Sequence, residues 1–157
     1  MKKSLILAAI LAVVSVATAV AQPRAIGANI GWGLDVSYQH SLGEANMIDL
    51  SVNIPGFNGI GATATYDWIN PFGTAIPWNE KGEWNWSLGV GAGAGIYGFK
   101  DPAVYVGAVG HVGVEYNFWF PLQLSVDYRP NIGWNFGANK FNTDGFYGVT
   151  LGVRYLF

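Results

Sequence analysis

Apolar and polar residues alternate along most of the chain beyond residue 24. In the first such segment, Arg24–Tyr38, the even positions from Ile26 onward are apolar, and the odd positions are small or polar. Neighbouring side chains of a β-strand point to opposite faces, so this period of two predicts a strand with one apolar face. Six further segments show the same alternation, at residues 48–54, 60–68, 84–96, 104–116, 120–128 and 147–157. The pattern predicts an all-β chain.

The size of the side chains on the two faces indicates which face points outward. The apolar face carries the bulky side chains, and the other face is mostly glycine with scattered Asp, Asn, Ser and Thr. Charged residues make up 11% of the chain, against about 25% in ordinary globular proteins. Water would solvate a soluble sandwich or barrel with such an exterior poorly. A membrane barrel turns its apolar face to lipid and closes so that every backbone group is paired. We therefore expect a single closed antiparallel transmembrane β-barrel.

The first residues predict export. A short start with two lysines precedes an uncharged apolar run over residues 5–17, and the small-x-small site at Ala19 and Ala21 is followed by Gln22. This order is typical of a secretory signal peptide, here residues 1–21. The run is short for a membrane-spanning helix, which needs about 20 apolar residues.

Residues 22–157 then form the mature chain, predicted to be one barrel domain. It carries six basic and ten acidic residues, a balance that argues against nucleic acid as a partner. The chain has no cysteine, which excludes a lipid-anchored start, disulfides and thiolate metal sites.

Eight ionisable side chains fall on the polar face. Charges inside a barrel must pair or meet water, and eight strands leave an interior that side chains about fill. We favour a salt-bridged polar plug, and a narrow cation-preferring channel is the alternative. The eight residues are Asp35, Asp49, Asp67, His111, Glu115, Asp127, Arg129 and Arg154.

Aromatic side chains gather near the ends of the segments, where a girdle at the lipid headgroups would place them. The candidates for this girdle are Trp68, Trp84, Trp86, Tyr116, Trp119 and Tyr128.

The C-terminal segment carries the most specific resemblance to a known family. Phe157, preceded by alternating Leu151, Val153 and Tyr155, resembles the signal that the barrel-assembly machinery recognises. The mature chain resembles in pattern the small outer-membrane β-barrels of Gram-negative bacteria, the OmpX/OmpA-like proteins. This resemblance implies a monomer of structural or interaction type in the outer membrane. Its partners would be outer-membrane lipid, lipopolysaccharide, and the export and barrel-assembly machinery.

Such barrels have an even strand number because both termini face the periplasm, and eight strands fit the mature length. Seven blocks of alternation are clear. The eighth strand comes either from splitting Arg24–Tyr38 at Gly31-Trp32-Gly33, or from Ile132, Trp134 and Phe136. The second assignment places the long connection Ile69–Glu83 outside the cell.

One chemical motif is set aside, and a second leaves a lipid A-modifying hydrolase as the lesser alternative. Gly93–Gly98 has the glycine spacing of a dinucleotide-binding loop. Such a loop has to lead into a helix, and no helix is predicted after these residues. His111 and Glu115 share a face, as in a barrel enzyme of the lipid A deacylase type, but spacing on one strand does not place a base within about 3 Å of a partner. No catalytic residue, cofactor or metal is predicted.

The export prediction has a direct test. If the signal peptidase cuts after Ala21, N-terminal sequencing of the mature protein, purified from a Gram-negative host, should begin at Gln22. An uncleaved chain recovered from the inner membrane would contradict both the signal peptide and the barrel in the outer membrane.

Overall fold

The computed structural model describes residues 22–73, 81–142 and 148–157. All regular structure in these residues is β, and they contain no helix long and apolar enough to cross a membrane. The strands are β1 (Gln22–Ile30), β2 (Gly33–Ser41), β3 (Asn46–Pro55), β4 (Gly59–Pro71), β5 (Gly82–Tyr97), β6 (Ala103–Phe118), β7 (Leu122–Tyr128), β8 (Asn131–Asn135), β9 (Lys140–Asn142) and β10 (Val149–Leu156).

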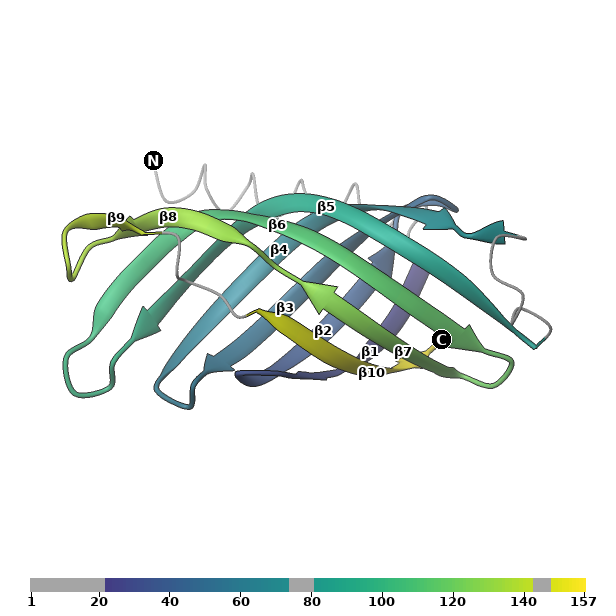
Figure 1. Ribbon diagram of the computed structural model, residues 1–157, viewed down its shortest axis with the longest axis horizontal. Coiled ribbons are helices and arrows are strands. Elements are labelled where there is room, and N and C mark those ends of the chain that lie inside the picture. The colour runs from purple at the N-terminus through teal and green to yellow at the C-terminus, as the bar shows by residue number, and fades with distance from the viewer. Residues whose placement is uncertain (1–21, 74–80, 143–147) are drawn as a thin grey trace, which may run out of the picture.

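The strands close into one antiparallel barrel (Figure 1). Each strand from β1 to β6 pairs with the next, and β10 pairs with β1 and β7. Both β7 and β8 pair with β6, β7 along its second half and β8 along its first. They are two parts of one strand interrupted at Arg129-Pro130, where proline cannot donate to the ladder. In the same way β9 pairs with β8 while β10 pairs with β7. The predicted eight-stranded closed barrel is confirmed.

The structure also decides where the eighth strand comes from. The first segment splits at Gly31-Trp32 into β1 and β2, and pairing extends to Gln22 and Ser41, so each strand has 9 residues. The other assignment is wrong, because Ile132 and Trp134 lie in β8, which continues β7 along β6.

The strand directions place Gln22 and Phe157 at one end of the barrel, here called the terminal end. β1 begins there and β10 ends there, with the Phe157 amide donating to the Arg24 carbonyl. β4 ends and β5 begins at this same end, on the right in Figure 1. The assignment that put the connection between them at the opposite end is therefore wrong. The opposite, distal end carries short turns, such as Gly31-Trp32 between β1 and β2, and also the β8–β9 hairpin.

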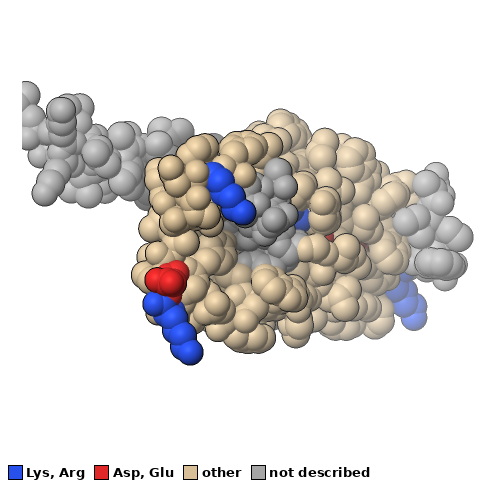
Figure 2. All heavy atoms as spheres, turned by 60° about the vertical axis from the view of Figure 1, so that its left-hand side comes forward, with Lys and Arg blue, Asp and Glu red and all other residues tan. Residues whose placement is uncertain are grey.

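The barrel has an inverted distribution of polar and apolar side chains. Burial alternates along the strands, with polar residues inside and apolar ones outside. Only four apolar residues are buried within the described ranges: Ala25, Met47, Tyr105 and Val109. Tyr105 and Val109 are the two that interrupt the alternation in the sequence. The space-filling view shows an outer wall almost free of charge (Figure 2). The exposed charged residues of the described ranges lie in or beside turns: Glu44, Lys81, Glu83, Lys100, Asp101 and Lys140.

The candidate girdle aromatics concentrate at the terminal end. Trp84 and Tyr116 face each other across β5 and β6 with ring centroids 4.9 Å apart, and Phe118 lies 4.7 Å from Tyr116. Trp68, Trp86 and Trp119 lie on or beside the same ends of β4, β5 and β6. Tyr128 differs, because it faces outward where β7 ends, opposite Val112 on β6.

Closure between β1 and β10 can be tested by cross-linking, since the chain has no cysteine of its own. Ala28 and Val153 face each other in this pair, and facing residues have Cα atoms within the range a disulfide spans. The variant Ala28→Cys/Val153→Cys should form an intramolecular disulfide in the folded protein, seen as a mobility shift of the boiled chain on gels without reductant. The control variant Ala28→Cys/Leu88→Cys places its cysteines on β1 and β5 and should form none. Equal cross-linking of both variants would contradict the barrel register.

Candidate functional site

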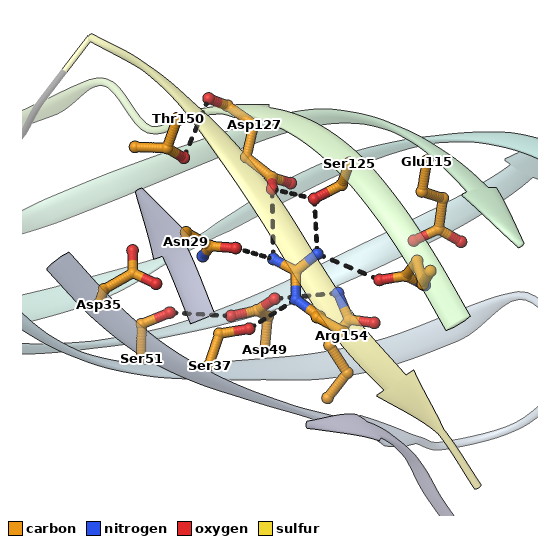
Figure 3. A network of polar contacts seen from close by, with 12 residues as sticks. Asn29, Asp35, Ser37, Asp49, Ser51, Glu115, Ser125, Asp127, Thr150 and Arg154 are labelled. Atoms are coloured by element: carbon orange, nitrogen blue, oxygen red, sulfur yellow. Dashed lines mark hydrogen bonds and ion pairs between the residues drawn. The ribbon is translucent and has the colours of Figure 1, made fainter. Parts of the chain in front are cut away.

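The lumen is organised around the guanidinium group of Arg154, which reaches from β10 into the interior (Figure 3). Its side chain is 0% exposed, and its three nitrogens all donate to neighbours from β1, β2 and β7. Charge-assisted hydrogen bonds of this kind are the strong ones. The acceptors are Ser37 Oγ at 2.7 Å, Gln123 Oε1 at 3.1 Å, Ser125 Oγ at 2.6 Å, Asn29 Oδ1 at 2.8 Å and Asp127 Oδ2 at 3.2 Å.

A second cluster surrounds His111 on β6. Its Nε2 lies 2.9 Å from Oδ1 of Asp127 on β7, and its Nδ1 lies 3.1 Å from Oδ1 of Asp67 on β4. Asp127 therefore contacts both His111 and Arg154, and it joins the two clusters.

Arg129 crosses the lumen from the junction of β7 and β8. Its guanidinium lies 3.5 Å from Oδ2 of Asp35 on β2 and 3.2 Å from Oδ1 of Asp49 on β3. One arginine thus pairs with two carboxylates, as the planar fork of its side chain allows. Because β3 and β7 belong to distant parts of the closed sheet, this bridge ties opposite walls together.

Arg24 is an inward charge that the sequence pattern does not identify. Strict alternation with Ile26 would point it outward. The register shifts between Pro23 and Ala25, so Arg24 sits in a β-bulge, a device that re-aims side chains. Its guanidinium makes a two-pronged ion pair with Glu115 on β6. The nearby Pro23, which cannot donate to the ladder, is the one local signal for this irregularity.

Three of the aspartates are supported by a hydroxyl two residues away on the same strand face. Ser51 donates to Asp49, Thr65 to Asp67 and Ser125 to Asp127, over 2.5–3.2 Å. Carboxylate oxygens that the arginines do not satisfy accept hydrogen bonds in this way. The recurring hydroxyl-x-Asp or Asp-x-hydroxyl spacing is a sequence signal for these pairs.

Inward glycines make room for the charged side chains. A Cβ at Gly89 would lie 1.4 Å from Oδ1 of Asp67, and one at Gly113 would lie 2.7 Å from Oδ1 of Asp127. One at Gly152 would lie 2.3 Å from the Ser125 hydroxyl that Arg154 uses. The glycine-rich wall and the charged residues therefore form one packed interior.

The structure places all eight predicted inward residues inside the barrel, none more than 7% exposed. It does not bring His111 to Glu115, because Glu115 pairs with Arg24 and accepts from Asn85 at 3.5 Å. The four C-terminal side chains of the candidate assembly signal (Leu151, Val153, Tyr155 and Phe157) all lie on the outer surface. Of the cleavage-site residues, Gln22 opens β1, whereas Ala19 and Ala21 lie outside the described residues.

Ion pairs occupy the lumen at several levels. The Arg24–Glu115 and Arg129–Asp49 pairs join distant strands, whereas Arg154 and His111 join neighbouring or nearby strands. The pocket beside Asn29 and Asp35 has about 10 Å³, close to the room for one water. A larger polar pocket of about 250 Å³ opens at the terminal end beside Arg24.

Removing Arg154 tests the network. Arg154→Ala leaves the Asp127 carboxylate without its guanidinium partner, and breaking a buried pair costs about 3–5 kcal/mol. Unfolding in urea can be measured by the loss of the fast-migrating folded band on unboiled gels. The midpoint of this unfolding should shift to a lower urea concentration. Arg154→Lys keeps the positive charge but loses the planar fork of the guanidinium. Its unfolding midpoint should lie between those of the wild type and Arg154→Ala. Exposed Lys140→Ala is the matched control and should leave the midpoint unchanged. An unchanged midpoint for Arg154→Ala would contradict the network.

Comparisons with known proteins add no assignment. The chain matches no protein-family model, and it has no significant match among curated proteins or solved structures. No relative assigns a role to this lumen, so its function has to be inferred from the residues that line it.

Proposed function

We propose that the chain is an integral outer-membrane β-barrel of structural or interaction type, with a sealed, salt-bridged lumen and no catalytic activity. The observation that carries this proposal is the inverted side-chain distribution. Thirty-five large hydrophobic side chains are exposed, against four buried apolar residues in the described ranges. Soluble monomers rarely expose contiguous apolar patches beyond a few hundred Å², whereas a lipid bilayer solvates such a surface and a closed barrel pairs its backbone.

Export and assembly are proposed from the two ends of the chain. The signal peptide of residues 1–21 would direct the chain through the inner membrane. The outward side chains of Leu151, Val153, Tyr155 and Phe157 on and after β10 leave the predicted assembly signal accessible. Lipid and lipopolysaccharide would then surround the folded monomer.

The orientation follows from the resemblance to small outer-membrane barrels, whose termini face the periplasm. The terminal end, with the connection between Pro71 and Gly82, would then be periplasmic. The distal turns, such as Gly31-Trp32 and Gly56-Phe57-Asn58, are short. The β8–β9 hairpin and the ends of β5 and β6 beside it extend further at this end, beyond the last pair between β7 and β10. This projection would be the part of the barrel that extends furthest on the outer side.

The cross-lumen bridges favour a plug over the alternative channel. Each guanidinium in the lumen is held by at least one carboxylate, so an ion would have to displace these pairs to pass. The enzyme alternative is not proposed, because the His111 side chain is 0% exposed and faces two aspartates.

The proposal is tested by location and conductance together. The mature protein should fractionate with outer membranes, resist carbonate extraction and migrate as a heat-modifiable band. Reconstituted into planar bilayers beside a general porin as positive control, it should give no steady current. Recovery in the soluble periplasmic fraction would overturn the membrane location. Steady cation-selective current from the folded protein would overturn the sealed lumen.

A further inference from the structure

Asp49, Asp67 and His111 come from three different strands and meet in the lumen. Each offers one candidate ligand atom, and these atoms all lie within 4.8 Å of one another. The three residues are at most 1% exposed. Asp67 and His111 occupy one register row with Gly89 between them on β5. Because Gly89 has no side chain, the Asp67 carboxylate fills the space in front of it and reaches His111.

Two buried atoms of this cluster face each other without a hydrogen bond. Nδ1 of His111 and Oδ1 of Asp67 are 3.1 Å apart, within ion-pair distance, but neither atom makes a hydrogen bond. Buried polar atoms in native proteins are nearly always satisfied. Two ligand atoms bound to one Zn²⁺ ion at about 2.1 Å lie about 3.0–3.4 Å apart for right-angle to tetrahedral geometry. The spacing therefore fits two ligands that share a cation.

The other side of the imidazole is held as in a metal site. Nε2 of His111 lies 2.9 Å from Oδ1 of Asp127, and when Nε2 carries the proton, Nδ1 presents a lone pair to Asp67. Metal-binding histidines commonly donate their second nitrogen to a carboxylate, which fixes the ring and its tautomer. Asp127 is itself held by Ser125 and Arg154.

The aspartate ligands are also oriented by neighbours. Oδ2 of Asp67 accepts from Thr65 at 3.1 Å, which leaves Oδ1 directed at His111. Asp49 accepts from Gln39 at 3.2 Å and Ser51 at 3.2 Å. It also contacts Arg129, so a bound cation would share this carboxylate with the guanidinium.

The charge balance of the lumen points the same way. The described inward groups include five carboxylates (Asp35, Asp49, Asp67, Glu115 and Asp127) and three guanidinium groups (Arg24, Arg129 and Arg154). Two negative charges remain uncompensated while His111 is neutral. Buried charge is costly unless it is paired, and one divalent cation supplies two positive charges.

We propose that Asp49, Asp67 and His111 bind one divalent transition-metal ion of the Zn²⁺ class. A ligand set of one imidazole nitrogen and two carboxylate oxygens suits such ions, whereas Mg²⁺ and Ca²⁺ prefer oxygen alone. The ion ties β3, β4 and β6 together inside the barrel. The site depends on the lumen only, so it holds whether or not the barrel lies in the outer membrane.

The test uses the full mature chain without a histidine tag, folded in detergent with Zn²⁺ and passed through metal-free buffer. Elemental analysis of the folded fraction should find about one Zn²⁺ per barrel, since a structural ion is held as part of the fold. His111→Gln and Asp67→Asn should each lose at least nine-tenths of it. His40→Gln removes the only other histidine and should retain the ion. Folding of every variant is checked by heat-modifiable migration.

Two outcomes overturn the proposal. Folded wild-type protein with no Zn²⁺ above a buffer blank would show that His111 is a cation bridging Asp67 and Asp127. Retention by folded His111→Gln or Asp67→Asn would show a surface ion only. Should both variants fail to fold, Co²⁺-loaded wild-type protein decides: visible d–d absorption with a nitrogen-containing ligand set supports the site, and its absence rejects it.

Discussion

Inside this barrel, three arginine side chains face five carboxylates in a space that strands enclose on every side. Charges in such a space have to be paired, and the cost of leaving one alone exceeds the gain from most other contacts. Arg154 donates to five partners from three strands, and Arg129 joins β3 to the β7–β8 junction. These contacts therefore tie β10 to its neighbours and, through Arg129, hold opposite walls of the lumen together.

Other features of the chain follow from this constraint. Glycines at positions 89, 113 and 152 leave the volume that Asp67, Asp127 and Arg154 occupy. Hydroxyl groups two residues from three of the aspartates satisfy oxygens that the arginines do not reach. Apolar burial contributes little inside, with four buried apolar residues in the described ranges. Stability then rests on closed strand pairing, on the ion pairs and on what solvates the apolar exterior.

Much of this arrangement can be predicted from the sequence, because a period of two assigns every strand residue to one of two faces. That rule places all eight predicted ionisable residues inside. It shows seven clear blocks, and the even strand number of such barrels together with the mature length predicts the eighth strand. It fails where the backbone departs from regular pairing. The bulge at Arg24 reverses its direction, and the break at Arg129-Pro130 makes β7 and β8 resemble two strands. Alternation also leaves open which inward groups meet. Asp67 and His111 are separated by 44 positions and a strand, and only the register through Gly89 brings them together.

The central claim, that the apolar face meets lipid while the polar face is sealed inside, can be measured on outward positions of a chain that has no native cysteine. Spin labels at Val52, Val90 and Val126, all about half exposed on the outer wall, would be compared in liposomes by collision with oxygen and with a water-soluble nickel complex. Oxygen should collide freely with all three labels and the nickel complex rarely, because oxygen partitions into the bilayer. Strong collision with the nickel complex at these positions in the folded protein would place the outer wall in water and contradict the account.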